Sequence, residues 1–185
     1  MSVVGLTGYA GSGKDTAAEA LIEIGYTRLA FADPMREGLL GINPWVCVDP
    51  SSHVGPPAQF QRLRRIIERM GWDRAKRAYP DIRALQQNYG TEGGRHIHGD
   101  TCWTDALKRK MLPGRNYVVT DVRFPNEVGL IHTLGGKVVR IRRHGVAAVN
   151  AHVSDTGIDA LQVDYELNND AGIDDLHNRL RGLVA

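Results

Sequence analysis

The distribution of apolar residues divides the start of the chain into strand-like and helix-like segments. "SVVGLT" is a short β-branched run before a glycine-rich turn, and "DTAAEALIEIG" follows with apolar residues at helical spacing. Gly25 is expected to cap that helix, and "YTRLAFA" predicts a second strand that stops at Asp33 and Pro34. A strand, a turn, a helix and a strand within about 30 residues predict a βαβ unit, whose strands are normally parallel.

The middle of the chain, from about residue 35 to residue 112, has a different pattern. A Pro-rich connection, "INPWVCVDPSSHVGPPAQ", is flanked by the helix-like segments "MREGLLG", "FQRLRRIIERMG", "DIRALQQNYG" and "DTCWTDALKRKML". We interpret this region as a helical insertion into one domain rather than as a second domain.

Strand-like and helix-like segments alternate again toward the C-terminus. "NYVVTDV", "GKVVRIRR" and "VDYELN" predict strands, and "PNEVGLIHTLG" and "GIDDLHNRLRGLV" predict helices. The chain therefore predicts one three-layer α/β/α domain with a five-stranded parallel sheet, whose core comprises residues 1–34 and 114–185. Ligands bind such sheets at the carboxyl ends of the strands.

Composition and charge are those of an ordinary globular protein, with 185 residues, 42% apolar and 24% charged. The sequence lacks an apolar run of membrane-spanning length and the features of a signal peptide, so we expect a cytoplasmic protein with reduced thiols at Cys47 and Cys102. The net charge of +2 does not imply a nucleic-acid partner. Eight basic residues against three acidic ones between Arg62 and Arg83 are interpreted as a helix surface.

The segment "GYAGSGKDT" indicates a phosphate-binding loop. Gly8, Gly13 and Lys14 have the spacing of that loop, which also requires a preceding strand and a following helix. Glycines let successive backbone N–H groups point at one anion, the helix N-terminus adds positive charge, and Lys14 can reach the outer phosphates. Asp15 stands where the pattern has Ser or Thr.

Two carboxylates are candidate magnesium ligands. Asp15 is a hard-oxygen donor beside Thr16, whose hydroxyl is expected to bond an inner phosphate; alternatively, Asp15 is only a first-turn helix residue. Asp121 ends a hydrophobic strand, where a second metal-facing carboxylate is expected, or it caps the following helix. Arg123 would stand on the same side if the strand continued, and it suits either a phosphoryl oxygen or an ion pair with Glu127.

Several segments together resemble the bacteriophage deoxynucleoside monophosphate kinases. They are "GLTGYAGSGKDT", "FADPMRE", "LQQNYGTEGGR", "VVTDVRFPNE", "VVRIRR", "NAHVSD" and "LNNDAGIDDL", which run from Gly5 to Leu176. The resemblance implies an adenylate kinase-like P-loop fold, in which residues 35–112 form the monophosphate-binding insertion and residues 143–160 a short lid. It also implies transfer of the ATP γ-phosphoryl group to a deoxynucleoside monophosphate, which yields a diphosphate and ADP.

The resemblance also implies roles for individual residues. The expected contacts to ATP and magnesium are Gly11, Ser12, Gly13, Lys14, Asp15, Thr16 and Asn169, with Asp121 as a further metal ligand. The expected acceptor contacts are Asp33, Arg36, Gln86, Arg95, Trp103 and Arg123. The expected catalytic groups are Lys14, Arg123 and a lid arginine, Arg142 or Arg143. Several of these acceptor and lid residues also have plainer interpretations as turn, surface or core residues, and the role of His152 in the lid is open.

Two alternative functions differ in the acceptor. A dephospho-coenzyme A kinase-like enzyme would phosphorylate a sugar hydroxyl and would need a general base such as Asp33. A nucleic-acid-associated NTPase would use the basic stretch Arg62–Arg83. The motifs of the insertion favour a nucleotide monophosphate as the partner, without nucleic acid or membrane. They leave open which bases are accepted and whether the protein is a monomer or a homodimer.

Overall fold

The computed structural model describes residues 1–49, 59–147 and 157–184, and the chain separates into two compact units. Unit 1 comprises Met1–Phe31 and Thr104–Ala185, and unit 2 comprises Ala32–Trp103. The chain returns to unit 1 earlier than the expected boundary near residue 112, because Leu107 belongs to the hydrophobic core of that unit.

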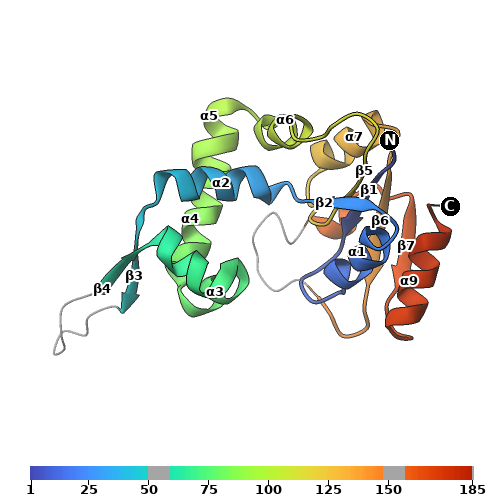
Figure 1. Ribbon diagram of the computed structural model, residues 1–185, viewed down its shortest axis with the longest axis horizontal. Coiled ribbons are helices and arrows are strands. Elements are labelled where there is room, and N and C mark those ends of the chain that lie inside the picture. Colours follow the sequence, from blue (N-terminus) through green and yellow to red (C-terminus); the bar gives the residue numbers. More distant parts are fainter. Residues whose placement is uncertain (50–58, 148–156, 185) are drawn as a thin grey trace. The chain divides into compact units, whose positions relative to one another are not determined.

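The core of unit 1 is a five-stranded sheet. Strands β1 (Val3–Thr7), β2 (Tyr26–Leu29), β5 (Asn116–Val119), β6 (Lys137–Arg142) and β7 (Tyr165–Asn168) lie in the order β2-β5-β1-β6-β7. Every neighbouring pair is parallel, which confirms the predicted sheet (Figure 1). Strand β2 ends at Leu29, before the end of the strand-like run "YTRLAFA".

Helices cover both faces of this sheet. Successive side chains of a strand point to opposite faces, so neighbouring residues of β1 pack against different helices. Val4 and Leu6 pack with helices α1 (Lys14–Ile22) and α9 (Ile173–Gly182). Val3 packs with α7 (Pro125–Thr133) and with Leu107 of α6 (Cys102–Lys108). The predicted three-layer α/β/α arrangement is confirmed.

Unit 2 is mainly helical, as predicted. It contains α2 (Ala32–Ile42), α3 (Leu63–Ala78), α4 (Pro80–Gly90), a π-helical turn η1 (Thr91–Arg95) and α5 (His96–His98). Its separate core consists of Leu39, Val46, Leu63, Ile66, Ala75 and Ile82. Helix α3 is kinked at Gly71, which has a φ of 72°.

The Pro-rich connection of unit 2 contains strands, which the sequence analysis did not predict. β3 (Trp45–Asp49) and β4 (Gln59–Arg62) pair antiparallel, and residues 50–58 between them lie outside the described part of the chain. Val46 is buried in the core, whereas Trp45 is exposed and its ring lies 4.3 Å from the Arg62 guanidinium. The helix expected from "FQRLRRIIERMG" therefore begins only at Leu63.

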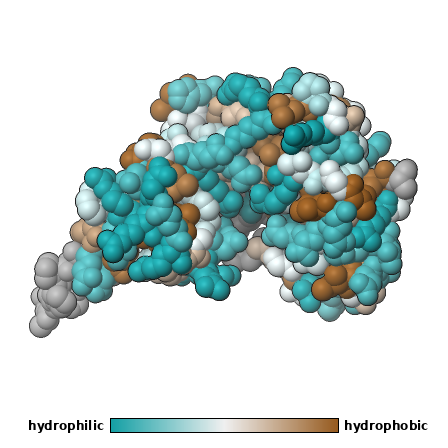
Figure 2. All heavy atoms as spheres, in the orientation of Figure 1, coloured by the Kyte–Doolittle hydropathy of each residue, from teal (hydrophilic) through white to brown (hydrophobic). Residues whose placement is uncertain are grey.

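The visible surface is largely hydrophilic, with scattered hydrophobic patches (Figure 2). Among the described residues, no helix is both long enough and apolar enough to cross a membrane. Cys47 and Cys102 are free thiols.

Candidate functional site

The loop between β1 and α1 has the backbone conformation that its glycines permit. Gly8, Gly11 and Gly13 have φ angles of 141°, 82° and 100°, in the region that favours glycine. A Cβ at Gly8 would lie 2.3 Å from the carbonyl oxygen of Ile141. A Cβ at Gly13 would lie 2.2 Å from Nδ2 of Asn169. The loop is thus packed closely against the ends of the neighbouring strands.

Polar groups of this loop fit a phosphate-bearing ligand. Lys14 Nζ donates to the carbonyl oxygens of Gly8 (2.8 Å) and Tyr9 (2.7 Å) across the loop. The hydroxyls of Thr7 and Ser12 are buried and have no hydrogen-bond partner among the described residues. Because a buried hydroxyl without a partner is costly, these two groups suit a polar ligand at the loop.

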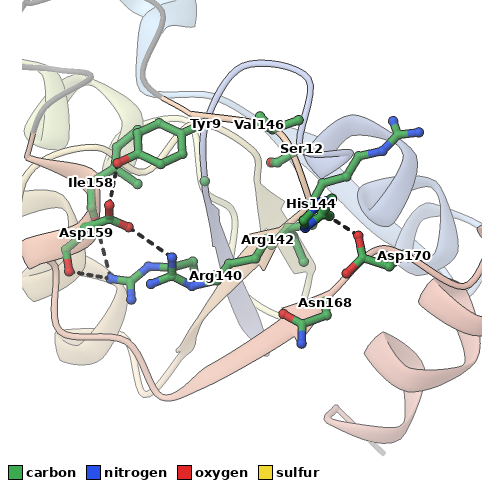
Figure 3. A pocket seen from close by; sticks show the side chains of 13 residues that line it. Tyr9, Ser12, Arg140, Arg142, His144, Val146, Ile158, Asp159, Asn168 and Asp170 are labelled. Atoms are coloured by element: carbon green, nitrogen blue, oxygen red, sulfur yellow. Dashed lines mark hydrogen bonds and ion pairs between the residues drawn. The ribbon is translucent and has the colours of Figure 1, made fainter.

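A cavity of about 250 Å³ opens beside the loop (Figure 3). Its walls come from the loop, the end of β6, the turn η2 (Ile158–Ala160) and the turn after β7. The lining residues are Gly8, Tyr9, Ser12, Arg140, Ile141, Arg142, Arg143, His144, Val146, Ile158, Asp159, Asn168 and Asp170. The lining includes three arginines and two aspartates, and Arg140 and Arg142 are paired with carboxylates, so Arg143 is the lining arginine best able to meet an anionic ligand.

Arg140 supports the wall of the cavity from a buried position. Its Nη2 donates to the carbonyl oxygens of Ile158 (3.1 Å), Asp159 (3.3 Å) and Leu161 (2.7 Å), and its Nη1 pairs with Glu166. This arginine ties β6 to the turn η2 and to β7.

Arg142 is already paired within the protein. It lies 3.1 Å from Glu166. It also lies 3.3 Å from Asp159, which accepts a hydrogen bond from the hydroxyl of Tyr9 (Figure 3). The Arg142 hydrogen bond holds the pKa of Glu166 below its usual value, whereas the hydrogen bond to Asp159 raises the pKa of Tyr9. Arg143 is exposed and lines the same cavity, with no ion pair among the described residues.

Asn169, expected at the nucleotide, contacts the backbone of the phosphate loop. Its Nδ2 donates to the carbonyl oxygen of Ser12 (2.9 Å), and its backbone N–H donates to the carbonyl oxygen of Arg142 (2.7 Å). The next residue, Asp170, accepts a hydrogen bond from the backbone N–H of His144 (2.9 Å). The turn after β7 therefore joins the loop to the end of β6.

The two candidate metal ligands lie on different elements of unit 1. Asp15 is exposed in the first turn of α1, and Thr16 follows it as a half-buried residue. Asp121 follows β5 and accepts a hydrogen bond from the backbone N–H of Phe31 (2.7 Å). Within the described ranges, no group of three or more His, Cys, Asp or Glu is arranged to hold a metal ion.

The expected geometry of Arg123 is corrected by the structure. β5 ends at Val119, so the argument that Arg123 stands on the same side as Asp121 along a continuing strand does not hold. Glu127 accepts hydrogen bonds from the backbone N–H groups of Arg123 (2.7 Å) and Phe124 (3.1 Å). The start of α7 is therefore capped by Glu127.

In unit 2, Arg36 contacts Asp33, which was expected at the acceptor, and Trp72, which was not. It lies 3.7 Å from Asp33, and its guanidinium lies 5.7 Å from the ring centroid of Trp72. Its Nε is buried without a hydrogen-bond partner among the described residues, and so is Nε2 of Gln86. No motif singled out Trp72, because a ring that stacks on an arginine has no sequence spacing of its own.

Trp103 packs against the glycine-rich turn of unit 2. Its Nε1 donates to the carbonyl oxygen of Gly90 (2.8 Å), and a Cβ at Gly94 would lie 2.4 Å from its ring. The ring of Tyr89 lies 5.7 Å away at 54°. Arg95, at the end of the same turn, donates to the carbonyl oxygen of Asp100 (3.0 Å).

The residues expected at the two substrates are thus divided between the units. Those expected at ATP and magnesium belong to unit 1, and all those expected at the acceptor except Arg123 belong to unit 2. Residues 148–156 of the expected lid, including His152, lie outside the described residues.

Comparison with known proteins identifies the family. The profile of the deoxynucleotide monophosphate kinase family matches residues 58–180, more than half of the chain. The chain belongs to this family. A protein of Acanthamoeba polyphaga mimivirus, provisionally named a deoxynucleotide monophosphate kinase, is 29% identical over 193 residues, which cover 100% of this chain and 96% of that protein.

Solved structures of lower sequence identity cover 98% or more of the chain. TT1252 from Thermus thermophilus has a TM-score of 0.49 at 16% identity, and covers 98% of this chain and 95% of its own. Shikimate kinase from Bacteroides thetaiotaomicron has a TM-score of 0.47 at 14% identity, with coverage of 99% and 98%. Dephospho-CoA kinase from Campylobacter jejuni has a TM-score of 0.43 at 16% identity, with coverage of 100% and 96%.

As a member of the deoxynucleotide monophosphate kinase family, the protein is a nucleotide kinase, an enzyme that transfers a phosphoryl group. The family resemblance that the sequence motifs indicated is confirmed.

Proposed function

We propose that unit 1 binds ATP and that side chains of unit 2 bind a deoxynucleoside monophosphate, which receives the γ-phosphoryl group and leaves as the diphosphate. The assignment of these nucleotides to particular residues rests on one observation. Six described residues have a buried polar side-chain atom without a hydrogen-bond partner among the described residues. Three of them, Ser12, Arg36 and Gln86, are residues that the resemblance assigned to the two nucleotides, and the others are Thr7, Gln61 and Arg140. A protein tolerates such atoms where a ligand satisfies them.

The phosphate loop would hold the donor. Backbone N–H groups of Gly11 and Gly13, the Ser12 and Thr16 hydroxyls and the Lys14 ammonium would bind phosphate oxygens of ATP. Lys14 would exchange the loop carbonyls that it now contacts for phosphate oxygens. Transfer between two phosphates needs positioning and charge neutralisation rather than covalent catalysis, so these contacts would make up much of the mechanism.

Magnesium suits the donor set of unit 1. Mg²⁺ is commonly bound by one or two carboxylates together with substrate phosphates, and Asp15 and Asp121 supply such oxygens. When bound, the ion would neutralise part of the charge on the transferred group.

Unit 2 would hold the acceptor. Arg36 would bind the acceptor phosphate through its Nε, and Gln86 would read a base edge with its Nε2; neither atom has a hydrogen-bond partner in the described part of the chain. Asp33 would orient Arg36. Arg95 would supply a second positive charge. Trp103 would support the glycine-rich turn, since its N–H is already bonded to Gly90.

Of the two lid arginines, Arg143 is the better candidate for the transferred phosphoryl group. The charge of Arg142 is already paired with Asp159 and Glu166, whereas Arg143 has no ion pair among the described residues. Arg123 would supply a further positive charge near the carboxylate of Asp121.

The proposal is tested by ADP release in a coupled assay with ATP and magnesium. Each of the four common deoxynucleoside monophosphates and dephospho-coenzyme A would be offered as acceptor. We expect turnover with one or more monophosphates, together with a higher KM for the monophosphate in Gln86→Ala. Turnover with dephospho-coenzyme A alone would contradict the acceptor assignment. ADP release that is independent of every acceptor would indicate an NTPase.

A further inference from the structure

We infer that Asn169 is a positioning residue that holds the phosphate loop in its binding conformation through the carbonyl oxygen of Ser12. The inference rests on the proposed ATP site of unit 1. It replaces the expectation that Asn169 touches the donor nucleotide itself.

Two hydrogen bonds place Asn169 between β6 and the loop. Its backbone N–H donates to the carbonyl oxygen of Arg142 (2.7 Å), which fixes the turn after β7 to the end of β6 whatever the side chain is. From this anchored position, Nδ2 donates to the carbonyl oxygen of Ser12 (2.9 Å). The contact joins residues that are 157 positions apart in the chain.

The fit between Asn169 and the loop is close. A Cβ at Gly13 would lie 2.2 Å from Nδ2 and 3.3 Å from Cγ of Asn169. The peptide that joins Ser12 to Gly13 therefore lies directly against the amide, and Gly13 has a φ of 100° at the N-terminal end of α1.

The orientation of that peptide decides where a phosphate-binding donor points. A trans peptide is planar, with its C=O and N–H directed to opposite sides. When the Ser12 carbonyl is held toward Asn169, the N–H of Gly13 is directed away from it. Without the amide, the Ser12 carbonyl loses its Asn169 donor, and the peptide has less reason to keep one orientation.

The lining of the cavity beside the loop distinguishes Asn169 from the residues on either side of it in the chain. Asn168 and Asp170 are among the described residues that line the cavity, whereas Asn169 is not. Asn168 and Asp170 therefore border the cavity, whereas the amide of Asn169 is bonded to the loop.

The test compares a ligand that has a base with one that lacks it. Dissociation constants for ATP and for inorganic tripolyphosphate, both with magnesium, are measured by titration calorimetry. The variants are Asn169→Asp, which replaces the NH₂ donor with a carboxylate oxygen, and Asn169→Ala. Asn178→Asp, on the exposed surface of α9, makes the same chemical change away from the loop and serves as the control.

Within each Asn169 variant, we expect the dissociation constants of ATP and of tripolyphosphate to rise by the same factor. That factor should be roughly tenfold, the effect of losing one hydrogen bond and leaving its acceptor without a partner. The control should bind both ligands as the parent does. Equal loss for a ligand without a base is the result that an indirect, positioning role requires.

Weaker binding of ATP with unchanged binding of tripolyphosphate would overturn the inference, because Asn169 would then contact the nucleoside. Unchanged binding of both ligands would also overturn it. A parent protein that binds neither ligand would overturn the proposed donor site itself, and the inference with it. Thermal unfolding checks that each variant is folded, and Asn169→Ala gives the same comparison without an added charge if Asn169→Asp does not fold.

Discussion

Arg140 makes the largest set of hydrogen bonds to backbone carbonyls beside the cavity, and its replacement should be costly. In Arg140→Met the apolar part of the side chain is kept and the guanidinium is lost. The carbonyl oxygens of Ile158 and Leu161 are buried with their present donor, and that of Asp159 is partly buried. A hydrogen bond from a charged donor contributes about 1.5–3 kcal/mol to stability, and leaving a buried carbonyl without a donor costs a similar free energy.

The burial of the guanidinium itself costs free energy, which offsets part of this gain. We therefore expect Arg140→Met to lower the free energy of unfolding by about 3 kcal/mol, the value for two buried carbonyls at the low end of that range. Urea unfolding followed by far-UV circular dichroism measures the change. Arg115→Met, at an exposed position before β5, is the matched control and should stay within about 0.5 kcal/mol of the parent. The reasoning would be refuted if Arg140→Met changed the free energy of unfolding by no more than about 0.5 kcal/mol, with the same slope of that free energy against urea concentration as in the parent.

Three further predictions concern other parts of the molecule. Gly94→Ala should destabilise unit 2 by about 1–3 kcal/mol and alter tryptophan fluorescence, because the new Cβ would lie 2.4 Å from the Trp103 ring; unchanged fluorescence and stability would contradict the packing. Arg142 lowers the pKa of Glu166, so this carboxylate stabilises the fold above its unfolded pKa of about 4.3 and loses that effect as the pH falls through its lower folded pKa. Glu166→Gln should therefore be less stable than the parent at neutral pH and approach it in acid, as followed by thermal unfolding across pH; a constant difference would argue against the ion pair. Asp15→Ala should need more magnesium for half-maximal ADP release, and an unchanged magnesium dependence would remove Asp15 as a ligand.

The sheet and the phosphate loop could be predicted because the information is local. Buried strands such as Val3–Thr7 are short apolar runs, and the loop has glycines at positions whose φ angles require them. The hairpin of unit 2 could not be predicted in the same way. Trp45 and Phe60 are both exposed, so the apolar residues of β3 and β4 do not mark a buried face. Val46 is buried in the core and Val48 packs against it, and two residues are too few to establish a period.

The contacts that support the site could not be predicted from the sequence either. Arg140 was one of several arginines in "VVRIRR", and nothing local distinguishes its burial from the exposure of Arg143. The contact of Asn169 with Ser12 depends on the pairing of β1 with β6 and of β6 with β7, which together bring residues from the two ends of the chain side by side. The family resemblance indicated that these segments matter, but it did not indicate which atoms they contact.

The position of unit 2 in the chain affects how the enzyme folds. The insertion leaves unit 1 after β2 and returns before β5, and these two strands are hydrogen-bonded neighbours in register from Tyr26 with Asn116 to Leu29 with Val119. Their pairing must close a loop that contains the whole of unit 2. If unit 2 collapses first around its own core, the loop behaves as a shorter one, and each halving of its effective length lowers the closure cost by about 0.6 kcal/mol. The edge strand β2 should therefore join the sheet late in refolding, and amide protection should develop there after it develops between β6 and β7, because the loop between those two strands does not contain unit 2.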